Sequence, residues 1–357
     1  MNAPQPHGFH VPEVNDSVAL AAFKAQIAPL SLMPLWERTN RLVPGSECVP
    51  AVWPYAQTRP LLEQACGLIS KKQADRRVLV MENPALRGSS YITNSLFAGL
   101  QIILPGEVAH SHRHTPNALR FVVEGEGAYT SVDGIKIQMQ PGDFVVTPAW
   151  AWHDHGNLGD GPVVWMDGLD TPFVGLFGAH FRENYVNETY PVHCSADASV
   201  STYGFNLLPT QHQRAAADGQ PPLLVYSFER TRQALSHLAA LPEQSPDAAQ
   251  GYKLRYANPA TGGYPFTTMA AFMQWLPTGF RGQAYRSTDN AIFNVAEGSC
   301  RVEVGGRTHH LTAHDVLVVP PWESYRFEAD SHCMLFSFTD RAAQVALGFW
   351  REEYVAV

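Results

Sequence analysis

Three histidines, His110, His112 and His114, alternate along the stretch GEVAHSHRHTPNALRF, residues 106–121. Alternating side chains share one face of a β-strand, and imidazoles on one face can bind a metal ion. An extended strand separates residues 110 and 114 by roughly 13 Å, whereas an imidazole nitrogen binds a metal at about 2.1 Å. Two neighbouring histidines can therefore share one ion, and we expect the third ligand to come from another strand.

A second histidine pair, His153 and His155, lies in TPAWAWHDHGN, residues 147–157. This pair follows the apolar stretch DFVVTP (143–148), which predicts a strand. If the two strands lie antiparallel, one of these histidines completes a three-histidine site. Zinc and divalent iron both accept imidazole ligands, so these residues alone leave the metal open.

The elements that position these histidines belong to an internal repeat. Each copy contains short apolar runs separated by turn signals such as VDG (132–134), a pattern typical of a small antiparallel barrel or jelly roll. We therefore expect two barrels. The matching stretches are LPGEVAHSHRHTPNALRFVVEGEG (104–127) with LPTGFRGQAYRSTDNAIFNVAEGS (276–299), PGDFVVTPAW (141–150) with AHDVLVVPPW (313–322), and FRENYV (181–186) with WREEYV (350–355).

The composition indicates a β-rich protein with neither a nucleic-acid nor a membrane partner. The 357 residues are 45% hydrophobic and 16% charged, which permits a large core. The formal net charge of −8 argues against nucleic-acid binding. No apolar run has the length of a membrane span, and the N-terminus lacks the pattern of a signal peptide. Five scattered cysteines are typical of a reducing cytoplasm, where we expect the protein to lie.

The repeat divides the chain into four expected parts. A helical and irregular N-terminal extension covers residues 1–85, and the first barrel, which holds the histidines, covers 86–186. A connecting segment covers 187–255, and the second barrel with the C-terminal tail covers 256–357. Within the extension and the connecting segment we expect helices in DSVALAAFKAQIAPL (16–30) and FERTRQALSHLAAL (228–241), and loops in QRAAADGQPP (213–222) and PEQSPDAAQ (242–250).

Both histidine stretches resemble the two cupin motifs, G-x5-H-x-H-x3/4-E-x6-G and G-x5-P-x-G-x2-H-x3-N. Two departures are informative, because Ala118 stands where most cupins keep a glutamate ligand and Trp150 stands where the second motif has glycine. The first motif is matched by Gly106, His112, His114 and Gly125, and the second by Gly142, Pro148, His153 and Asn157. A two-module cupin with three histidines and no carboxylate resembles the gentisate 1,2-dioxygenase group, whose ring-cleaving relatives act on salicylate and 1-hydroxy-2-naphthoate. Stretches such as RRVLVMENP (76–84) and KLRYANPATGGY (253–264) extend this resemblance from about Leu35 to the end of the chain.

The resemblance implies an all-β bicupin, that is, two jelly-roll β-barrels behind a helical and irregular N-terminal extension. It also implies one Fe(II) per chain, held by His112, His114 and His153, and assembly as a homotetramer. The implied reaction is extradiol-type ring opening of gentisate (2,5-dihydroxybenzoate) by O2 to give maleylpyruvate. The same chemistry on salicylate or 1-hydroxy-2-naphthoate is the nearest alternative. A metal-free binding or storage bicupin and a zinc cupin isomerase are more distant ones, the latter disfavoured by Ala118.

Three neutral imidazoles leave the +2 charge of iron uncompensated, so a chelating hydroxybenzoate dianion can balance it. Arg120 matches His114 in strand parity, which suits a clamp for the substrate carboxylate, and His155 is expected to contact the phenolic oxygen and accept its proton. Asp167 is expected to orient a histidine or an arginine, since an unpaired carboxylate in an apolar strand is costly. The remaining substrate-binding residues that the resemblance implies are Arg76, for which Arg77 is an adjacent rival, Gln101 and Gly99, with Val78 and Phe97 as further determinants of the preferred ring.

The second copy of the repeat lacks the proposed chemistry while it keeps scaffold residues such as Gly279 and Trp322. Tyrosine, serine and phenylalanine replace the proposed active residues, so we expect a metal-free, structural barrel. The replacements are Tyr285 for His112, Ser287 for His114, Tyr325 for His153, Phe293 for Arg120, Phe327 for His155 and Ser337 for Asp167.

Overall fold

The structure is a computed structural model that describes residues 17–38, 41–207, 210 and 221–356. The chain divides into two compact units, residues 1–43 and 44–357. The first unit contains helix α1 (Ser17–Ile27) and two short 3-10 turns, Ala28–Leu30 and Leu35–Glu37. Phe23 stacks on Trp36 with ring centroids 6.4 Å apart, and Lys24 pairs with Glu37. The helix expected over 16–30 is therefore confirmed for its described residues.

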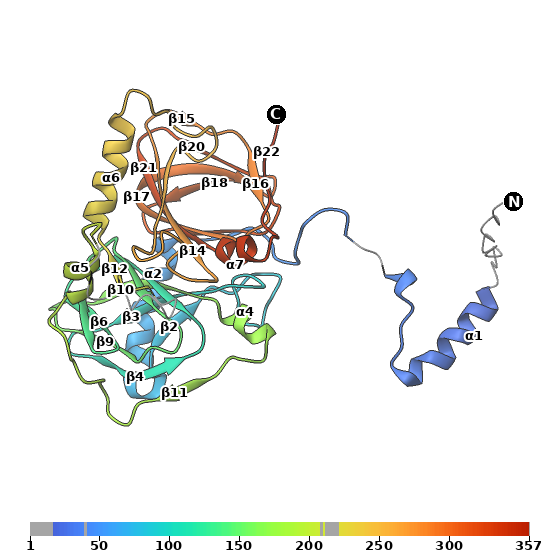
Figure 1. Ribbon diagram of the computed structural model, residues 1–357, viewed down its shortest axis with the longest axis horizontal. Helices are drawn as coiled ribbons and strands as arrows, with labels where there is room; N and C mark the ends of the chain where they lie inside the picture. Colours follow the sequence, from blue (N-terminus) through green and yellow to red (C-terminus); the bar gives the residue numbers. More distant parts are fainter. Residues whose placement is uncertain (1–16, 39–40, 208–209, 211–220, 357) are drawn as a thin grey trace, which may run out of the picture. The chain divides into compact units, whose positions relative to one another are not determined.

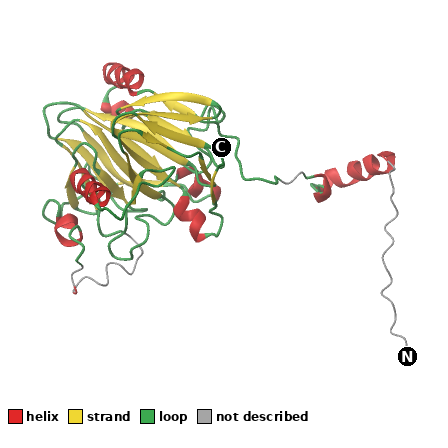
Figure 2. Ribbon diagram, turned by 90° about the horizontal axis from the view of Figure 1, so that it is seen from above, coloured by secondary structure: helices red, strands yellow, loops and turns green. Residues whose placement is uncertain are grey.

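Strands form most of the second unit (Figure 2). The first barrel consists of a six-stranded sheet in the order β12-β8-β5-β10-β3-β2 and a five-stranded sheet in the order β11-β4-β9-β6-β7. Its strands are β2 (Arg77–Val80), β3 (Phe97–Ile103), β4 (Val108–His114), β5 (Ala118–Glu124), β6 (Ala128–Val132), β7 (Ile135–Gln138), β8 (Phe144–Thr147), β9 (His153–Asn157), β10 (Val163–Leu169), β11 (Arg182–Asn184) and β12 (Val225–Tyr226).

The second barrel repeats this plan, and Figure 1 shows the two barrels one above the other, the first in green and the second in orange and red. A single long strand, β17, replaces the separate strands β5 and β6 of the first barrel and pairs in turn with β19, β21, β20 and β18. The strands are β1 (Ala51–Trp53), β13 (Tyr252–Arg255), β14 (Ala270–Leu276), β15 (Phe280–Arg281), β16 (Tyr285–Ser287), β17 (Ala291–Val304), β18 (Arg307–Thr312), β19 (Val316–Val319), β20 (Tyr325–Ala329), β21 (Cys333–Thr339) and β22 (Glu352–Tyr354).

Two glycines near the ends of the first matched stretches of the repeat allow tight turns. Gly125 and Gly298 have φ angles of 88° and 77°, in the left-handed region that favours glycine. A Cβ atom would lie 2.3 Å from the carbonyl oxygen of Pro162 at the first position and 2.2 Å from that of His332 at the second. Both turns therefore need glycine for the same steric reason, which explains why the two copies share it.

The two barrels exchange their outer strands. β1 precedes the first barrel in sequence but pairs antiparallel with β19 of the second, with Val52 opposite Leu317. β12 lies in the segment between the modules and pairs with β8 of the first barrel. Helix α2 (Tyr55–Leu68) then leads from β1 to β2, and α6 (Phe228–Ala240) leads from β12 to β13. Each structural repeat thus begins earlier than the barrel boundaries expected at residues 86 and 256.

The six-stranded sheet of the first barrel packs against the facing sheet of the second. Phe121 of β5 and Phe336 of β21 stack with ring centroids 4.2 Å apart and planes 9° apart. On β5 the residues next to Phe121, Arg120 and Val122, point instead into the first barrel, as the alternation of strand side chains requires. The shared core also contains Leu119, Val123, Phe144, Val146, Met166, Ala271, Met273, Ile292, Val318 and Phe338.

The remaining helices are short, namely α3 (Lys71–Ala74), α4 (Thr171–Leu176), α5 (Ala198–Tyr203) and α7 (Arg341–Ala346). The helix expected over 228–241 is confirmed as α6. The loop expected over 213–222 lies outside the described residues except for 221 and 222, and the segment 242–250 contains no helix or strand. None of the described helices combines the length and the apolar character needed to cross a lipid bilayer.

Phe336→Ala tests whether the shared core holds the barrels together. Phe336 is fully buried, so truncation should lower the free energy of unfolding by about 3–5 kcal/mol. Both barrels should lose stability together in denaturant titrations followed by fluorescence and circular dichroism. Leu347→Ala is the control, because Leu347 is 54% exposed and should change stability little. Separate transitions for the two barrels would contradict a shared core.

Candidate metal centre

Two neighbouring strands bring His112, His114 and His153 together. β4 carries the first two histidines and β9 carries the third, with His112 directly opposite His153 in the antiparallel pair. One ring nitrogen of each residue lies within 4.8 Å of those of the other two, and all three side chains are buried. Among the described residues this is the only group of three or more histidines, cysteines or carboxylates close enough to hold a metal ion. The third histidine of the cluster thus comes from another strand.

Backbone carbonyls fix the orientation of all three rings. Nδ1 of His112 donates to the carbonyl of His110 at 2.9 Å, Nδ1 of His114 donates to that of Pro116 at 2.8 Å, and Nδ1 of His153 donates to that of Ala151 at 2.9 Å. With the proton on Nδ1, each Nε2 keeps its lone pair for a metal. Nε2 of His153 is buried without any partner among the described residues, as expected for a ligand atom in a structure that carries no ion.

Burial keeps these imidazoles neutral. Desolvation, with Arg76 nearby, lowers the pKa of His112 to about 2, and desolvation lowers that of His114 to about 4. Burial likewise holds the pKa of His153 well below its usual value. A metal ion therefore does not have to displace protons from these ligands near neutral pH.

Arg76 rather than Arg77 reaches the cluster. Nη1 of Arg76 donates to Nε2 of His112 at 2.9 Å. Arg77 begins β2 with its side chain on the other side, where Nη1 binds Glu107 at 2.7 Å and Nε donates to the carbonyl of Ile69. Strand parity alone could not choose between these adjacent arginines, which follow a left-handed residue, Asp75, with φ of 59°.

Arg120 is fixed by three neighbours inside the barrel. Its Nη1 donates to Oγ1 of Thr147 at 2.6 Å, its Nη2 donates to Nε2 of His155 at 2.8 Å, and its Nε lies 3.5 Å from Oδ1 of Asp167. Asp167 also accepts a hydrogen bond from Nε1 of Trp165 at 3.0 Å. Burial lowers the pKa of Arg120 to about 10, so the guanidinium stays charged at neutral pH.

His155 lies behind Arg120, with both ring nitrogens engaged. Because Nε2 accepts from Arg120, Nδ1 carries the proton and donates to Oγ1 of Thr130 at 2.8 Å. Burial and the Arg120 charge hold the pKa of His155 well below its usual value. The arrangement favours an orienting role for His155 over the proton-accepting role expected from the sequence.

A cavity of about 610 Å³ lies beside this cluster, and His114 is the cluster histidine that lines it. Gln101, 3% exposed, projects into it from β3, and Phe97 lies on the same face of that strand. Gly99 lies between them, where a Cβ atom would be 2.6 Å from Cγ1 of Val78, so any side chain there would push Val78 aside. The other side chains that line the cavity include Arg76, Tyr91, His114, Pro116, Ala118, Arg120, Asp167, Leu169, His180 and Arg182.

Two positions in the histidine stretch lie outside the cluster. His110 is only partly buried, its Nδ1 contacts the carbonyl of Ser111 at 2.9 Å, and it is not part of the cluster. Ala118, at the position of the usual cupin glutamate, lines the cavity and leaves room where a carboxylate would otherwise project.

Sequence reasoning missed part of the cavity wall. β11 pairs with β4, which places Arg182 opposite His114, and Arg182 then binds Asp75 at 2.9 Å. His180 lines the cavity from the same segment. A signal was present, because FRENYV was one of the repeated stretches, but only the strand pairing shows that it lies beside the ligands. Thr130 and Thr147, which hold His155 and Arg120, gave no such signal.

The second barrel has the same geometry without the ligands. Tyr285 lies opposite Tyr325, just as His112 lies opposite His153, and Phe293 lies opposite Ser337, just as Arg120 lies opposite Asp167. The aromatic replacements belong to the apolar core of that barrel, which also contains Phe327. The hydroxyl of Tyr285 donates to Glu352 at 2.7 Å. The interior is thus occupied by packed rings where the first barrel has its cluster.

Three neutral imidazoles with converging Nε2 atoms can hold a divalent metal and leave other coordination positions open. Arg120 and Arg76 add positive charge beside those positions, where an anionic ligand gains most from it. The combination suits a metal-bound, negatively charged substrate in this cavity.

Comparison with known proteins identifies the cupin fold and the family of this chain. Residues 99–169 match the model of the cupin domain, and residues 284–346 match that of the AraC-like ligand binding domain. Gentisate 1,2 dioxygenase 1 of Aquipseudomonas alcaligenes is 46% identical over 333 residues, which cover 92% of this chain and 95% of the relative. The 1-hydroxy-2-naphthoate 1,2-dioxygenase of Nocardioides sp. (strain KP7) is 34% identical over 97% of this chain and 90% of its own length.

Among solved structures, the chain is similar to salicylate 1,2-dioxygenase from Pseudoaminobacter salicylatoxidans in its adduct with gentisate. The TM-score is 0.90 at 31% sequence identity, with 97% of each chain covered. Because the match runs through both modules, it supports the two-barrel fold along the whole chain.

The ligand assignment predicts opposite results for two histidines. His153→Ala removes an Nε2 atom of the cluster and should abolish stoichiometric metal binding. His110→Ala should keep metal content near that of the unchanged protein, because His110 lies outside the cluster. Metal analysis after gel filtration measures both, and thermal melting checks the fold. Metal retained in His153→Ala and lost in His110→Ala would contradict the assignment.

Proposed function

We propose that this protein opens the ring of gentisate with O2 to give maleylpyruvate. The chain belongs to the family of gentisate 1,2-dioxygenases and related ring-cleaving dioxygenases. The observation that carries the proposal is the carboxylate-free cluster of three histidines beside a cavity that is lined by Arg76, Arg120 and Arg182. The 46% identity to gentisate 1,2 dioxygenase 1 favours gentisate as the substrate.

The donor set fits one Fe(II) per chain. His112, His114 and His153 would hold it through Nε2, and Ala118 adds no carboxylate charge. Bound Fe(II) would supply the electron transfer that O2 needs to react with a closed-shell aromatic ring. An ion at His112 would replace Arg76 as the partner of Nε2, which frees the Arg76 guanidinium for the cavity. The tyrosine-lined interior of the second barrel supports a stoichiometry of one.

The residues of this chain would bind and orient the substrate. Arg120 and Arg76 offer charge-assisted hydrogen bonds to its carboxylate, and Gln101 offers an amide to an oxygen on the ring. Asp167, Thr147 and His155 would hold Arg120 in place, so they act as positioning residues. The apolar walls, which include Val78 and Phe97, would exclude water from the ring.

The same residues could accept related rings. Salicylate and 1-hydroxy-2-naphthoate keep the carboxylate and the neighbouring hydroxyl, and relatives named for both are similar to this chain. Phe97 offers no hydrogen-bond donor to a hydroxyl on the far side of the ring, which favours tolerance of rings without one. A metal-free binding bicupin would not need the unpaired Nε2 of His153, and a zinc isomerase would be expected to keep the glutamate that Ala118 replaces. A homotetrameric assembly and a cytoplasmic location stay predictions from the sequence.

An anaerobic titration tests metal and substrate together. Gentisate added to the iron-loaded protein without O2 should produce a new iron-dependent absorbance band, and admission of O2 should give maleylpyruvate with one O2 consumed per ring. Protein loaded with zinc should show neither. Salicylate and 1-hydroxy-2-naphthoate, titrated in parallel, rank the alternatives by kcat/KM. Iron-loaded protein that binds none of the three acids and consumes no O2 would refute the proposal.

Arg120→Ala tests the carboxylate clamp. A charge-assisted hydrogen bond contributes about 1.5–3 kcal/mol, so kcat/KM for gentisate should fall by roughly 10- to 200-fold while iron content stays unchanged. Arg120→Lys keeps the charge but loses the planar guanidinium, so its kcat/KM for gentisate should lie between those of the unchanged protein and Arg120→Ala. Arg281→Ala, an exposed arginine paired with Asp330, is the matched control. Unchanged kinetics in Arg120→Ala would move the clamp to Arg76.

A further inference from the structure

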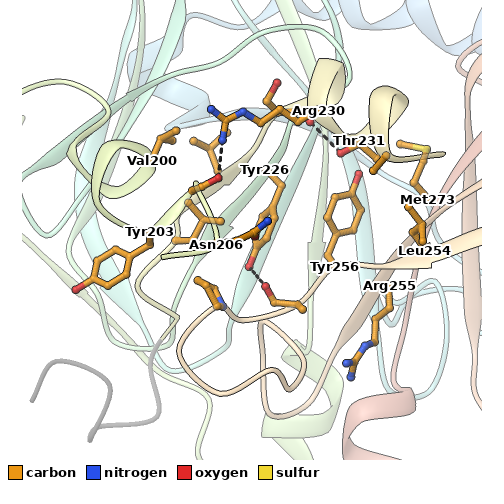
Figure 3. A pocket seen from close by; sticks show the side chains of 17 residues that line it. Val200, Tyr203, Asn206, Tyr226, Arg230, Thr231, Leu254, Arg255, Tyr256 and Met273 are labelled. Atoms are coloured by element: carbon orange, nitrogen blue, oxygen red, sulfur yellow. Dashed lines mark hydrogen bonds between the residues drawn. The ribbon is translucent and has the colours of Figure 1, made fainter. Parts of the chain in front are cut away.

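We propose that a second cavity, separate from the one at the histidines, binds a hydroxylated aromatic monocarboxylate. This cavity of about 390 Å³ lies where α5, β12, α6 and β13 meet (Figure 3). It shares no lining residue with the cavity at the metal centre. The proposal rests on its walls, its charge and one unpaired hydroxyl, and it does not depend on the catalytic activity.

The walls suit an aromatic ring. Tyr226 and Tyr256 lie side by side with ring centroids 5.3 Å apart and planes at 67° (Figure 3). Leu254 and Met273 add flexible apolar surface, and Val225 closes the side towards the first barrel. Small-molecule sites are typically concave and apolar with a few polar groups, as here. A planar ring can pack on the tyrosines edge to face or with an offset.

Two exposed arginines line the same cavity, with Arg230 stacked over the ring of Phe205 and Arg255 over that of Tyr264. Arg230 donates to the carbonyl of Gly204 at 2.5 Å, and Arg255 donates to that of Gly262 at 2.8 Å. A guanidinium has five N–H donors, so each arginine keeps donors for a ligand. In the described part of the chain neither arginine has a carboxylate partner. The lining contains no aspartate, glutamate or lysine. A cavity with this charge, in a chain of net charge −8, selects a carboxylate.

An unpaired hydroxyl specifies the rest of the ligand. Tyr256 is 7% exposed, and its hydroxyl points toward the Thr231 side chain without forming a hydrogen bond of normal geometry to any described residue (Figure 3). The neighbouring hydroxyls are satisfied, since that of Tyr226 donates to the carbonyl of Ala257 and that of Thr231 donates to the carbonyl of Ser227. A buried polar group without a partner is unfavourable. A hydroxyl on the ligand ring would give the Tyr256 hydroxyl a hydrogen-bond partner.

The probe for this site is 3-hydroxybenzoate, which carries one carboxylate and one hydroxyl but no hydroxyl beside the carboxylate with which to chelate a metal. Calorimetric titration of the metal-loaded protein should show binding at a site where the double variant Arg230→Ala with Arg255→Ala weakens affinity by roughly tenfold or more. Arg232→Ala is the matched control, because Arg232 lies on the same helix, is exposed and pairs with Glu297 at 3.6 Å. The affinity of Arg232→Ala for 3-hydroxybenzoate should be unchanged.

Tyr256→Phe should lower the affinity for 3-hydroxybenzoate to that for benzoate and leave benzoate binding unchanged. Arg120→Ala should leave the site intact, because Arg120 lines the other cavity. In a soaked crystal, density for the probe beside Arg230 and Tyr256 would support the proposal. Binding lost in Arg120→Ala but kept in the Arg230–Arg255 double variant, density beside His114 alone, or no binding to the unchanged protein would each overturn it.

Discussion

Burial of β5 and β10 on both faces is the constraint on which the centre depends. One face of β5 packs on the second barrel through Leu119 and Phe121, and the other face points into the first barrel. Any charge on that inner face is removed from water, so it must be paired. Arg120 and Asp167 are 2% and 7% exposed, lie directly opposite each other and neutralise one another. The apolar contact between the barrels thus makes a rigid, charged clamp possible beside the histidines.

The sequence was sufficient for the features that local rules determine. Alternating histidines, the distance along a strand and the second histidine pair predicted a three-histidine cluster drawn from two strands, and the repeated turns predicted two barrels. The choice of His112, His114 and His153 came from the resemblance to the gentisate 1,2-dioxygenase group. Long-range pairing was less accessible. β1 and β12 have three and two residues, too few for a recognisable pattern, and their partners lie in different modules. Periodicity could not choose between Arg76 and Arg77, which follow a left-handed residue, Asp75.

The two barrels show how one scaffold separates folding from chemistry. Turn glycines such as Gly125 and Gly298 occur in both because sterics require them. At the positions of the ligands, Tyr285 and Tyr325 pack against each other with ring centroids 5.7 Å apart, which stabilises the second barrel directly. The first barrel has three close imidazoles there instead. Its fold, which positions them, is stabilised by the core that it shares with the second barrel.

The exchanged outer strands make the order of synthesis matter. The amide of Tyr55, just after β1, donates to Asp315, 260 residues later in the chain. At roughly 5–20 residues per second, the ribosome needs on the order of 15–50 s to deliver that partner. β12 can pair at once, because its partner β8 has already been synthesised when β12 leaves the ribosome. In the finished protein the two halves have the same plan. During synthesis, however, the first barrel is completed first, and β1 remains an unpaired edge strand until β19 has been made. During that period, edge-to-edge association with another chain competes with folding.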